Sequence, residues 1–376
     1  MSLPKILYRD LLTAAKQFDR HASLRALLST NLLQRPVVHE TQMRLPHVEN
    51  FNRFVLEFLE NRSFYVPSVE KKALAQLVRD NFRAVEMDSS SSSPVRSSAA
   101  ADRVLVDTAF VALKALNDKL AEAKELGVIA GKPVKKLRYA ARAGKRQEKI
   151  EMPLSIANVQ HAEDLASGVY LVSHPLLNGL FSRSVIMLTE HSLKGARGFI
   201  VNQPTTNPLM KAFKVHPSIM RAFGSCKVRT GGPVRTEHAE VLHGKPEFGG
   251  KRVVTSNFRD VNDDSATLFV GVDLEIAAKA VEENLATQSE IMFVNGVSTW
   301  TAGQLENELK RGTWVAVKAP LSLAVNPNKD LWKDLMHTLG GEYREFSEMP
   351  EMADDDEEEE EEDEGDYVSE DGEEHD

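Results

Sequence analysis

The sequence predicts an all-α N-terminal module joined to a C-terminal α/β domain. In residues 3–29 apolar side chains recur at helical spacing. From Gly168 onward, short apolar runs of strand length alternate with helical patterns. The length of 376 residues is sufficient for two domains of ordinary size.

Residues 3–29 are expected to be helical because their apolar side chains share one face. That face consists of Leu3, Leu7, Leu11, Ala14 and Phe18. The run 34–36, Gln-Arg-Pro, is predicted to break the helix.

Three further helices are predicted in the N-terminal module. Residues 47–61 form one, and a second is expected to begin after Ser68 as its N-cap and to continue to about Met87. The third is expected to begin at Asp102 and to continue to about Leu126. The serine-rich segment 88–100 between the last two reads as a loop.

The C-terminal half shows strand and helix patterns in alternation, which predict a layered α/β domain. The expected strands are 169–172, 184–188, 197–201, 228–230, 239–242, 252–255, 268–272, 291–294 and 314–318. The expected helices are 208–213, 274–285, 302–311 and 329–339.

The charge distribution supports four segments: a helical module 1–126, a basic linker 127–165, an α/β domain 166–345 and an acidic tail 346–376. Residues 1–150 carry 26 Lys and Arg against 16 Asp and Glu, whereas residues 354–376 carry 17 acids and no Lys or Arg. The tail has too few apolar residues to offset the entropy of ordering, so it is expected to be disordered. The basic front half suggests an acidic partner.

Composition and motifs exclude several classes of chemistry. A single cysteine, Cys226, rules out an internal disulfide and a multi-cysteine metal or iron–sulfur site. No GxSxG, HExxH, Walker, GxGxxG or CxxC motif occurs, and no apolar run reaches the length of a membrane span. We therefore expect a protein that is not an enzyme and that holds no metal.

The remaining candidates for reactive side chains are Cys226 and the histidines of the C-terminal half. Cys226 precedes Lys227 and Arg229, which could lower its thiol pKa, or it could be a partly buried residue at a strand start. Structural or surface roles are expected for the scattered histidines of the C-terminal half. These are His161, His174, His191, His216, His238 and His243.

Two backbone patterns accompany these residues. Gly231 and Gly232 precede Pro233 and indicate a sharp turn. Thr301 is the expected N-cap of the helix 302–311, whose exposed N–H groups could either hold an anion or simply be capped.

The N-terminal residues Leu7-Tyr8-Arg9, followed by Phe18, resemble the signature of the mitochondrial LYR-motif family. The stretch 77–83, Leu-Val-Arg-Asp-Asn-Phe-Arg, is similar to that family's second helix. The resemblance implies a three-helix bundle that binds the mitochondrial acyl carrier protein, with the acylated 4'-phosphopantetheine of the partner entering between the helices. The chain departs from the family by about 45 residues between the first two helices, which implies an inserted helix.

The resemblance implies a binding surface for the acidic acyl carrier protein, because Arg and Lys can pair with its carboxylates and its cofactor phosphate. The expected residues are Leu7, Tyr8, Arg9, Phe18, Lys71, Lys72, Arg79, Phe82 and Arg83. The apolar faces around Leu11, Phe18 and Leu77 would line an acyl channel, or would otherwise form an ordinary helical core.

Residues 166–341 resemble the bacterial AlgH/YqgE family. The stretches that carry the resemblance are 168–177, 181–185, 188–192, 198–204, 231–234, 241–243 and 300–306. The family implies an α/β fold with a central mixed sheet and no agreed activity. A candidate pocket is expected around Glu190, His191, Asn202, Gly231, Gly232 and Trp300. Gln203 stands where the family usually has Arg, so an anion site that used this Arg would have lost its charge.

These resemblances together predict a non-catalytic adaptor in the mitochondrial matrix. The front module would bind acyl carrier protein, and the AlgH-like domain would dock a larger complex. The preferred client is the mitochondrial ribosome, because the eight Lys and Arg in residues 131–149 could touch RNA phosphates. The alternatives are an AlgH-like enzyme or small-molecule sensor, and an assembly factor for iron–sulfur clusters or respiratory complexes.

Overall fold

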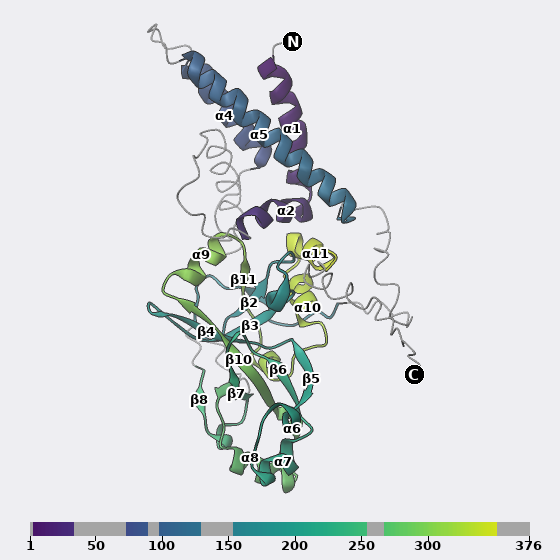
Figure 1. Cartoon of the computed structure of the whole chain (residues 1–376), viewed down its shortest axis with the longest axis vertical. Coiled ribbons are helices and arrows are strands. Elements are labelled where there is room, and N and C mark those ends of the chain that lie inside the picture. The colour runs from purple at the N-terminus through teal and green to yellow at the C-terminus, as the bar shows by residue number, and fades with distance from the viewer. Residues whose placement is uncertain (1–2, 34–72, 89–97, 129–152, 254–266, 352–376) are drawn as a thin grey trace, which may run out of the picture.

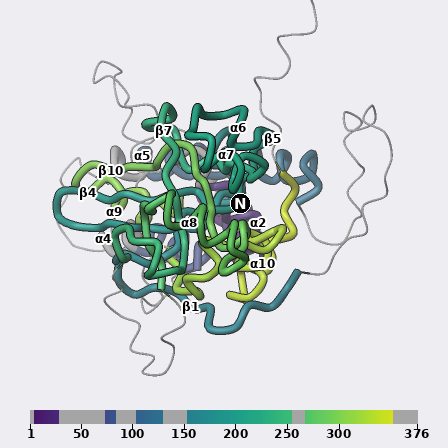
Figure 2. Tube along the Cα trace, turned by 90° about the horizontal axis from the view of Figure 1, so that it is seen from below, coloured from purple at the N-terminus to yellow at the C-terminus, as the bar shows by residue number. Residues whose placement is uncertain are grey.

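The computed structural model describes residues 3–33, 73–88, 98–128, 153–253 and 267–351. They form an elongated molecule in which helices occupy one end and a curled β-sheet with short helices occupies the rest (Figure 1). Seen along the long axis from the α8 end, the N-terminal helices lie behind the α/β domain (Figure 2).

The described part of the N-terminal module is all helical. It contains α1 (Leu3–Arg20), α2 (Ala22–Leu33), α4 (Leu74–Asp88) and α5 (Ser98–Glu125). One apolar cluster joins α1, α2, α4 and α5, and Phe18 is fully buried within it. Within the described residues, helices are therefore present in the predicted regions and share one packed core.

The helix boundaries differ from the predicted ones. The stretch 3–29 is divided at His21 into α1 and α2. The predicted start after Ser68 is wrong, because α4 begins at Leu74, where the carboxylate of Asp19 accepts hydrogen bonds from the Leu74 and Ala75 N–H groups at 2.7 and 3.0 Å. Asp102 is likewise no N-cap, since α5 begins at Ser98.

Several predicted segments lie outside the described residues. They are the break at 34–36, the helix 47–61, most of the serine-rich loop, the core of the basic linker and the acidic tail from 352 onward.

The described residues of the C-terminal half form an 11-stranded sheet. Its bounds are β1 (Gln160–His161), β2 (Tyr170–Ser173), β3 (Val185–Ser192), β4 (Gly195–Ile200), β5 (Pro204–Pro208), β6 (Lys227–Thr230), β7 (Val234–His243), β8 (Lys251–Arg252), β9 (Phe269–Val270), β10 (Ile291–Thr301) and β11 (Trp314–Lys318). The main order is β1-β11-β2-β3-β4-β10-β7-β9-β8, and β6 pairs with β10 and β5. The β6–β10 pair is parallel and the other pairs are antiparallel, so the sheet is mixed, as expected.

Short helices cover this sheet. They are α6 (Leu209–Ala212), α7 (Pro217–Phe223), α8 (Leu274–Glu282), α9 (Gln304–Lys310), α10 (Leu331–Leu339) and α11 (Gly341–Ser347). Single 3₁₀ turns occur at Gly179–Phe181, Pro246–Phe248, Gln288–Glu290 and Leu321–Ala324. Helix α10 packs Leu331, Trp332, Leu335 and Met336 into the cluster formed by β2, β3, β4 and β10.

Both ends of the α/β domain extend beyond the predicted limits of 166 and 345. In the predicted linker, β1 pairs with β11, and the Leu154 N–H donates to Asp334 at 2.8 Å. At the other end, α11 continues to Ser347, and Phe346 and Met349 are buried in the cluster of the helical module. The last helix of the domain thus belongs to both parts of the molecule.

Candidate functional site

A basic groove lies between the first turns of α1 and the C-terminal half of α4. It measures about 270 Å³ and is lined by Pro4, Lys5, Tyr8, Arg79, Phe82 and Arg83. Since Asp19, near the end of α1, contacts the start of α4, the two helices run antiparallel. This arrangement brings residues that are about 70 positions apart in the sequence to one surface.

Two aromatic rings and three cations define the chemistry of the groove. The rings of Tyr8 and Phe82 meet with their centroids 5.0 Å apart and an interplanar angle of 56°. Lys5, Arg79 and Arg83 supply positive charge, and none of the described residues that line the groove is acidic. Arg79 donates a hydrogen bond to the Gln76 side chain at 3.2 Å. The groove therefore favours an anionic partner that also carries apolar surface.

The structure separates the nine predicted acyl-carrier-protein contacts into four groups. Tyr8, Arg79, Phe82 and Arg83 line the groove together. Leu7 and Phe18 are instead buried core residues, with 3% and 0% of their surface exposed. Arg9 points elsewhere and pairs with Asp10 at 3.0 Å. Lys71 and Lys72 lie outside the described residues.

Sequence reasoning missed Lys5 and Pro4. Both precede Tyr8 by three or four positions, so they fall on the same helix face as Tyr8. Counting three and four residues back from Tyr8 would have identified both.

In the α/β domain, the residues of the expected pocket make several separate contacts. The side chain of Asn202 ties two strands together: its carbonyl oxygen accepts from Val185 N–H at 2.8 Å and its amide donates to Arg183 O at 2.9 Å. Gly231 and Gly232 allow close backbone contact, because a Cβ at Gly232 would lie 2.2 Å from the carbonyl carbon of Val297. These three residues stabilise the fold.

Trp300 is also held in a structural contact. Its indole N–H and that of Trp314 both donate to one oxygen of Glu308, at 2.8 and 2.7 Å. Glu308 belongs to α9, so this contact fixes α9 on the sheet. The N-cap of α9 is Gly303 in a left-handed conformation, and the prediction of Thr301 as N-cap is therefore wrong.

Glu190 and His191 point to different neighbours. His191 Nε2 lies 3.0 Å from Glu306 of α9. Glu190 pairs with Lys251 of β8 and lines a separate charged cleft. Of the six residues predicted for the pocket, Glu190 lines this charged cleft, and none lines the basic groove.

Two further histidines have structural roles, as predicted. His174 is buried, its Nδ1 accepts from Leu176 N–H at 3.2 Å, and burial lowers its pKa to about 3. His243 donates from Nε2 to Gly271 O at 2.8 Å and stacks on Phe269, and burial is the main cause that lowers its pKa. Both rings are therefore neutral at physiological pH.

No group of three or more His, Cys, Asp or Glu side chains in the described ranges is placed to hold a metal ion. The helices in those ranges include none with the length and apolar character of a membrane span.

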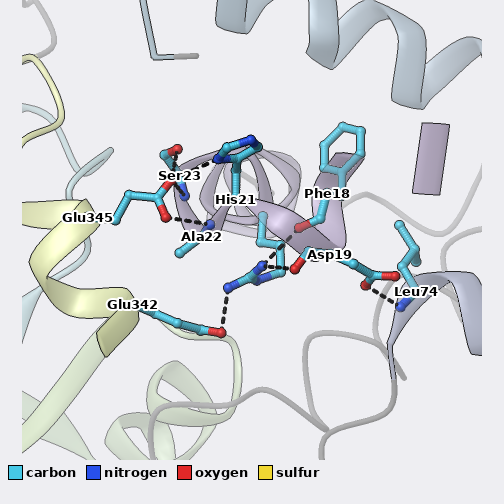
Figure 3. Close-up of polar contacts among 9 residues, drawn as sticks. Phe18, Asp19, His21, Ala22, Ser23, Leu74, Glu342 and Glu345 are labelled. Carbon is cyan, nitrogen blue, oxygen red and sulfur yellow. Dashed lines mark hydrogen bonds and ion pairs between the residues drawn. The ribbon is translucent and has the colours of Figure 1, made fainter. Parts of the chain in front are cut away.

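A polar joint connects the groove helices to the α/β domain (Figure 3). The carboxylate of Glu345 in α11 accepts from the N–H groups of Ala22 and Ser23 at 3.0 and 3.2 Å, and so caps the start of α2. Arg25 of α2 pairs with Glu342 and donates to the carbonyl oxygens of Phe18 and Asp19, both at 2.9 Å. The same Asp19 caps α4, so α4, α1, α2 and α11 are connected in series.

Comparison with known proteins identifies the α/β domain. A family model described as AlgH-like matches residues 170–344. A UPF0301 protein of Chlamydia muridarum is 31% identical over 194 residues, which are 50% of this chain and 93% of that protein. A UPF0301 protein of Bacteroides fragilis is 28% identical over 190 residues, 49% of this chain and 88% of that protein.

Solved structures also match. The solution structure of the AlgH protein of Pseudomonas aeruginosa is 20% identical, with a TM-score of 0.37, and the match covers 52% of this chain and 99% of AlgH. A crystal structure of a Corynebacterium diphtheriae protein is 21% identical, with a TM-score of 0.38, covering 49% of this chain and 92% of that protein. The match to the AlgH-like family model does not include the helical module. Through its C-terminal domain, this chain belongs to the AlgH-like UPF0301 family.

Proposed function

We propose that this protein is a non-catalytic adaptor whose helical module binds an acyl carrier protein. The observation that carries the proposal is the convergence of Lys5, Tyr8, Arg79, Phe82 and Arg83 on one groove between α1 and α4. The sequence resemblance to the LYR family singles out four of these five residues independently of the structure.

Charge complementarity supports this partner. The described lining of the groove carries three cations and no acidic residue, whereas acyl carrier proteins are acidic. Arg79 and Arg83 lie four positions apart on one helix face, so both guanidinium groups are able to engage carboxylates or a phosphate at once. Steering by such a basic surface accelerates association and weakens with salt.

The acylated 4'-phosphopantetheine of the partner would meet the groove at Tyr8 and Phe82. Leu11, Phe18 and Leu77, which the sequence suggested as channel lining, are at most 4% exposed and belong to a packed core. An acyl chain would therefore begin its path between the two aromatic rings and would have to part α1 from α4 to go deeper. Binding of the acylated form is expected to loosen the packing of these two helices.

The adaptor would use its other end to dock a larger complex, with the mitochondrial ribosome in the matrix as the proposed client. The groove lies at one end of the elongated molecule, and α6, α7 and α8 lie at the other (Figure 1). Met210, Ile276 and Leu285 expose large apolar side chains at that second end. The eight basic residues of 131–149 add affinity for RNA phosphates.

The test measures binding of the full chain to purified acyl carrier protein in its apo, phosphopantetheinylated and acylated forms. We compare the wild type with Arg79→Glu/Arg83→Glu and with a matched control, Lys16→Glu/Arg103→Glu. Lys16 and Arg103 are exposed residues of the same module outside the groove. Both double variants change the net charge equally.

The groove variant is expected to lose about 10-fold or more in affinity, because two favourable charge contacts become repulsive. The control should stay within about 2-fold of the wild type. An equal loss of affinity in both variants would mean that binding depends on the net charge of the module and not on the groove. Absence of binding by the wild type would refute the proposal.

A further inference from the structure

A second cleft lies in the AlgH-like domain, away from the groove of the helical module. Its volume is about 210 Å³. The lining residues are Thr189, Glu190, Arg197, Glu240, Lys251, Arg252, Val253 and Val270. They come from β3, β4, β7, β8 and β9 and from the residue after β8.

The cleft exists because the sheet curls on itself. Strands β3 and β8 are separated by β4, β10, β7 and β9 in the order of the sheet. The side chains of Glu190 on β3 and Lys251 on β8 nevertheless form an ion pair. The six strands therefore form an open, barrel-like wall, and the cleft lies at its mouth, a common position for small-molecule sites.

Two local irregularities aim side chains into this mouth. The register of β3 against β4 shifts between Leu188 and Glu190, so Thr189 forms a bulge, a feature that re-aims neighbouring side chains. Before β8, Gly250 has a φ of +87°, and a Cβ there would lie 2.2 Å from Gly271 O. Only glycine brings Lys251 and Arg252 this close to β9.

One of the three cations that line the cleft has no ion-pair partner among the described residues. Arg197 pairs with Glu240 at 2.9 Å, and Lys251 pairs with Glu190. Arg252 is exposed and forms no ion pair with any residue in the described part of the chain. The described lining therefore carries three cations against two carboxylates, a net charge of one positive unit that one anionic group would neutralise.

Apolar surface completes the cleft. Val253 and Val270 line it beside these charges; Val270 is partly exposed, whereas Val253 is only 5% exposed and belongs to the core of the domain. A ligand that presents only charge, such as inorganic phosphate, would leave this surface uncovered. A ligand with one anionic group and a short hydrocarbon body would satisfy both parts of the lining.

We propose that this cleft binds a small organic monoanion whose carboxylate pairs with Arg252 and whose short apolar body lies on Val270, beside Val253. The guanidinium offers two parallel N–H donors to a carboxylate. The site is independent of the acyl-carrier-protein groove, so it gives the AlgH-like domain a ligand of its own.

The experiment is a titration of the full chain, labelled with ¹³C at the valine methyl groups, followed by NMR. Butyrate is the probe, and butyramide, which has the same shape and no charge, is its matched comparison. Inorganic phosphate tests for an anion without an apolar body. The variants are Arg252→Gln and, as a control, Arg311→Gln, which removes an exposed arginine outside the cleft.

Butyrate is expected to shift the methyl signals of Val253 and Val270 in a saturable manner and to bind at least about 5-fold more tightly than butyramide. Arg252→Gln should weaken butyrate by about 5-fold or more, and Arg311→Gln should leave it unchanged. The proposal is overturned if butyramide binds equally well, if phosphate binds as tightly as butyrate, or if no valine of the cleft responds.

Discussion

Arg25 and Glu342 form an ion pair across the boundary between the helical module and the AlgH-like domain. The side chain of Arg25 is only 7% exposed, whereas that of Glu342 is 34% exposed. Because Arg25 also donates to the last carbonyl groups of α1, it holds three elements at once: α1, α2 and α11. This residue therefore couples the two parts of the molecule.

Arg25→Met is expected to lower the free energy of unfolding by about 2–4 kcal/mol, because it removes one buried donor from two carbonyl groups and from the Glu342 carboxylate. Calorimetry of the full chain measures the change. Arg9→Met is the matched control, since Arg9 is exposed and its one ion pair among the described residues is with its neighbour Asp10. It should change stability by less than about 0.5 kcal/mol. If Arg25→Met lowered the free energy of unfolding by as little as the control does, Arg25 would not couple the two parts of the molecule.

A second prediction concerns the contact of Glu308 with Trp300 and Trp314. Glu308→Leu leaves two buried indole N–H groups without an acceptor and is expected to cost about 2–4 kcal/mol. Glu308→Gln keeps a carbonyl oxygen at the same place and should cost less than about 1 kcal/mol. Urea unfolding followed by tryptophan fluorescence separates the two. Equal losses would mean that packing of α9, not the shared acceptor, is what matters.

Most of the described helices of the front module and most strands of the domain were predictable from periodicity, because burial of one face imposes spacing on the sequence. Strands β1 and β5 were not predicted. Contacts between distant segments could not be predicted in this way. The start of α4 depends on Asp19, which is 55 positions away from Leu74, so the local capping signal at Ser68 was misleading. Trp300 and Asn202 belong to recognisable family stretches, but no local pattern predicts that their side chains bond to Glu308 and to the Val185 N–H.

The groove was found in part from the sequence, because Tyr8, Arg79, Phe82 and Arg83 stand within patterns that a helix face preserves. Of the residues that line the cleft of the AlgH-like domain, the sequence singled out only Glu190. It depends on the curl that brings β8 to β3, and no local pattern encodes the pairing of residues 190 and 251.

The ion pair of Glu190 with Lys251 predicts a specific pH dependence. The hydrogen bond from Lys251 holds the pKa of Glu190 below its ordinary value. The stabilisation is therefore fully present above the carboxyl pKa of the unfolded chain, and it is lost as the pH falls through the lowered pKa of the folded state. Both side chains are largely exposed, at 48% and 74%, so the contribution to stability is small.

Lys251→Met is expected to raise the pKa of Glu190 toward its ordinary value, as measured by NMR titration of its carboxyl carbon. Lys245→Met provides the control, because Lys245 pairs with Glu290 and should leave Glu190 unchanged. An unchanged Glu190 pKa in Lys251→Met would show that the pair does not persist in solution.

The last prediction concerns Cys226, the only cysteine of the chain. The sequence left two readings: a thiol pKa lowered by the basic neighbours, or a partly buried residue at a strand start. The thiol is partly buried, and burial raises its pKa. Since the thiolate is the reactive form, alkylation by iodoacetamide at pH 8 should be about 10-fold or more slower in the folded chain than in denaturant. The alkylation rate of the folded protein should keep rising at a pH where that of the unfolded chain has levelled. Mass spectrometry of timed samples measures both rates. Equal rates in the two states, or a folded-state rate that levels at lower pH, would show that Lys227 and Arg229 outweigh burial.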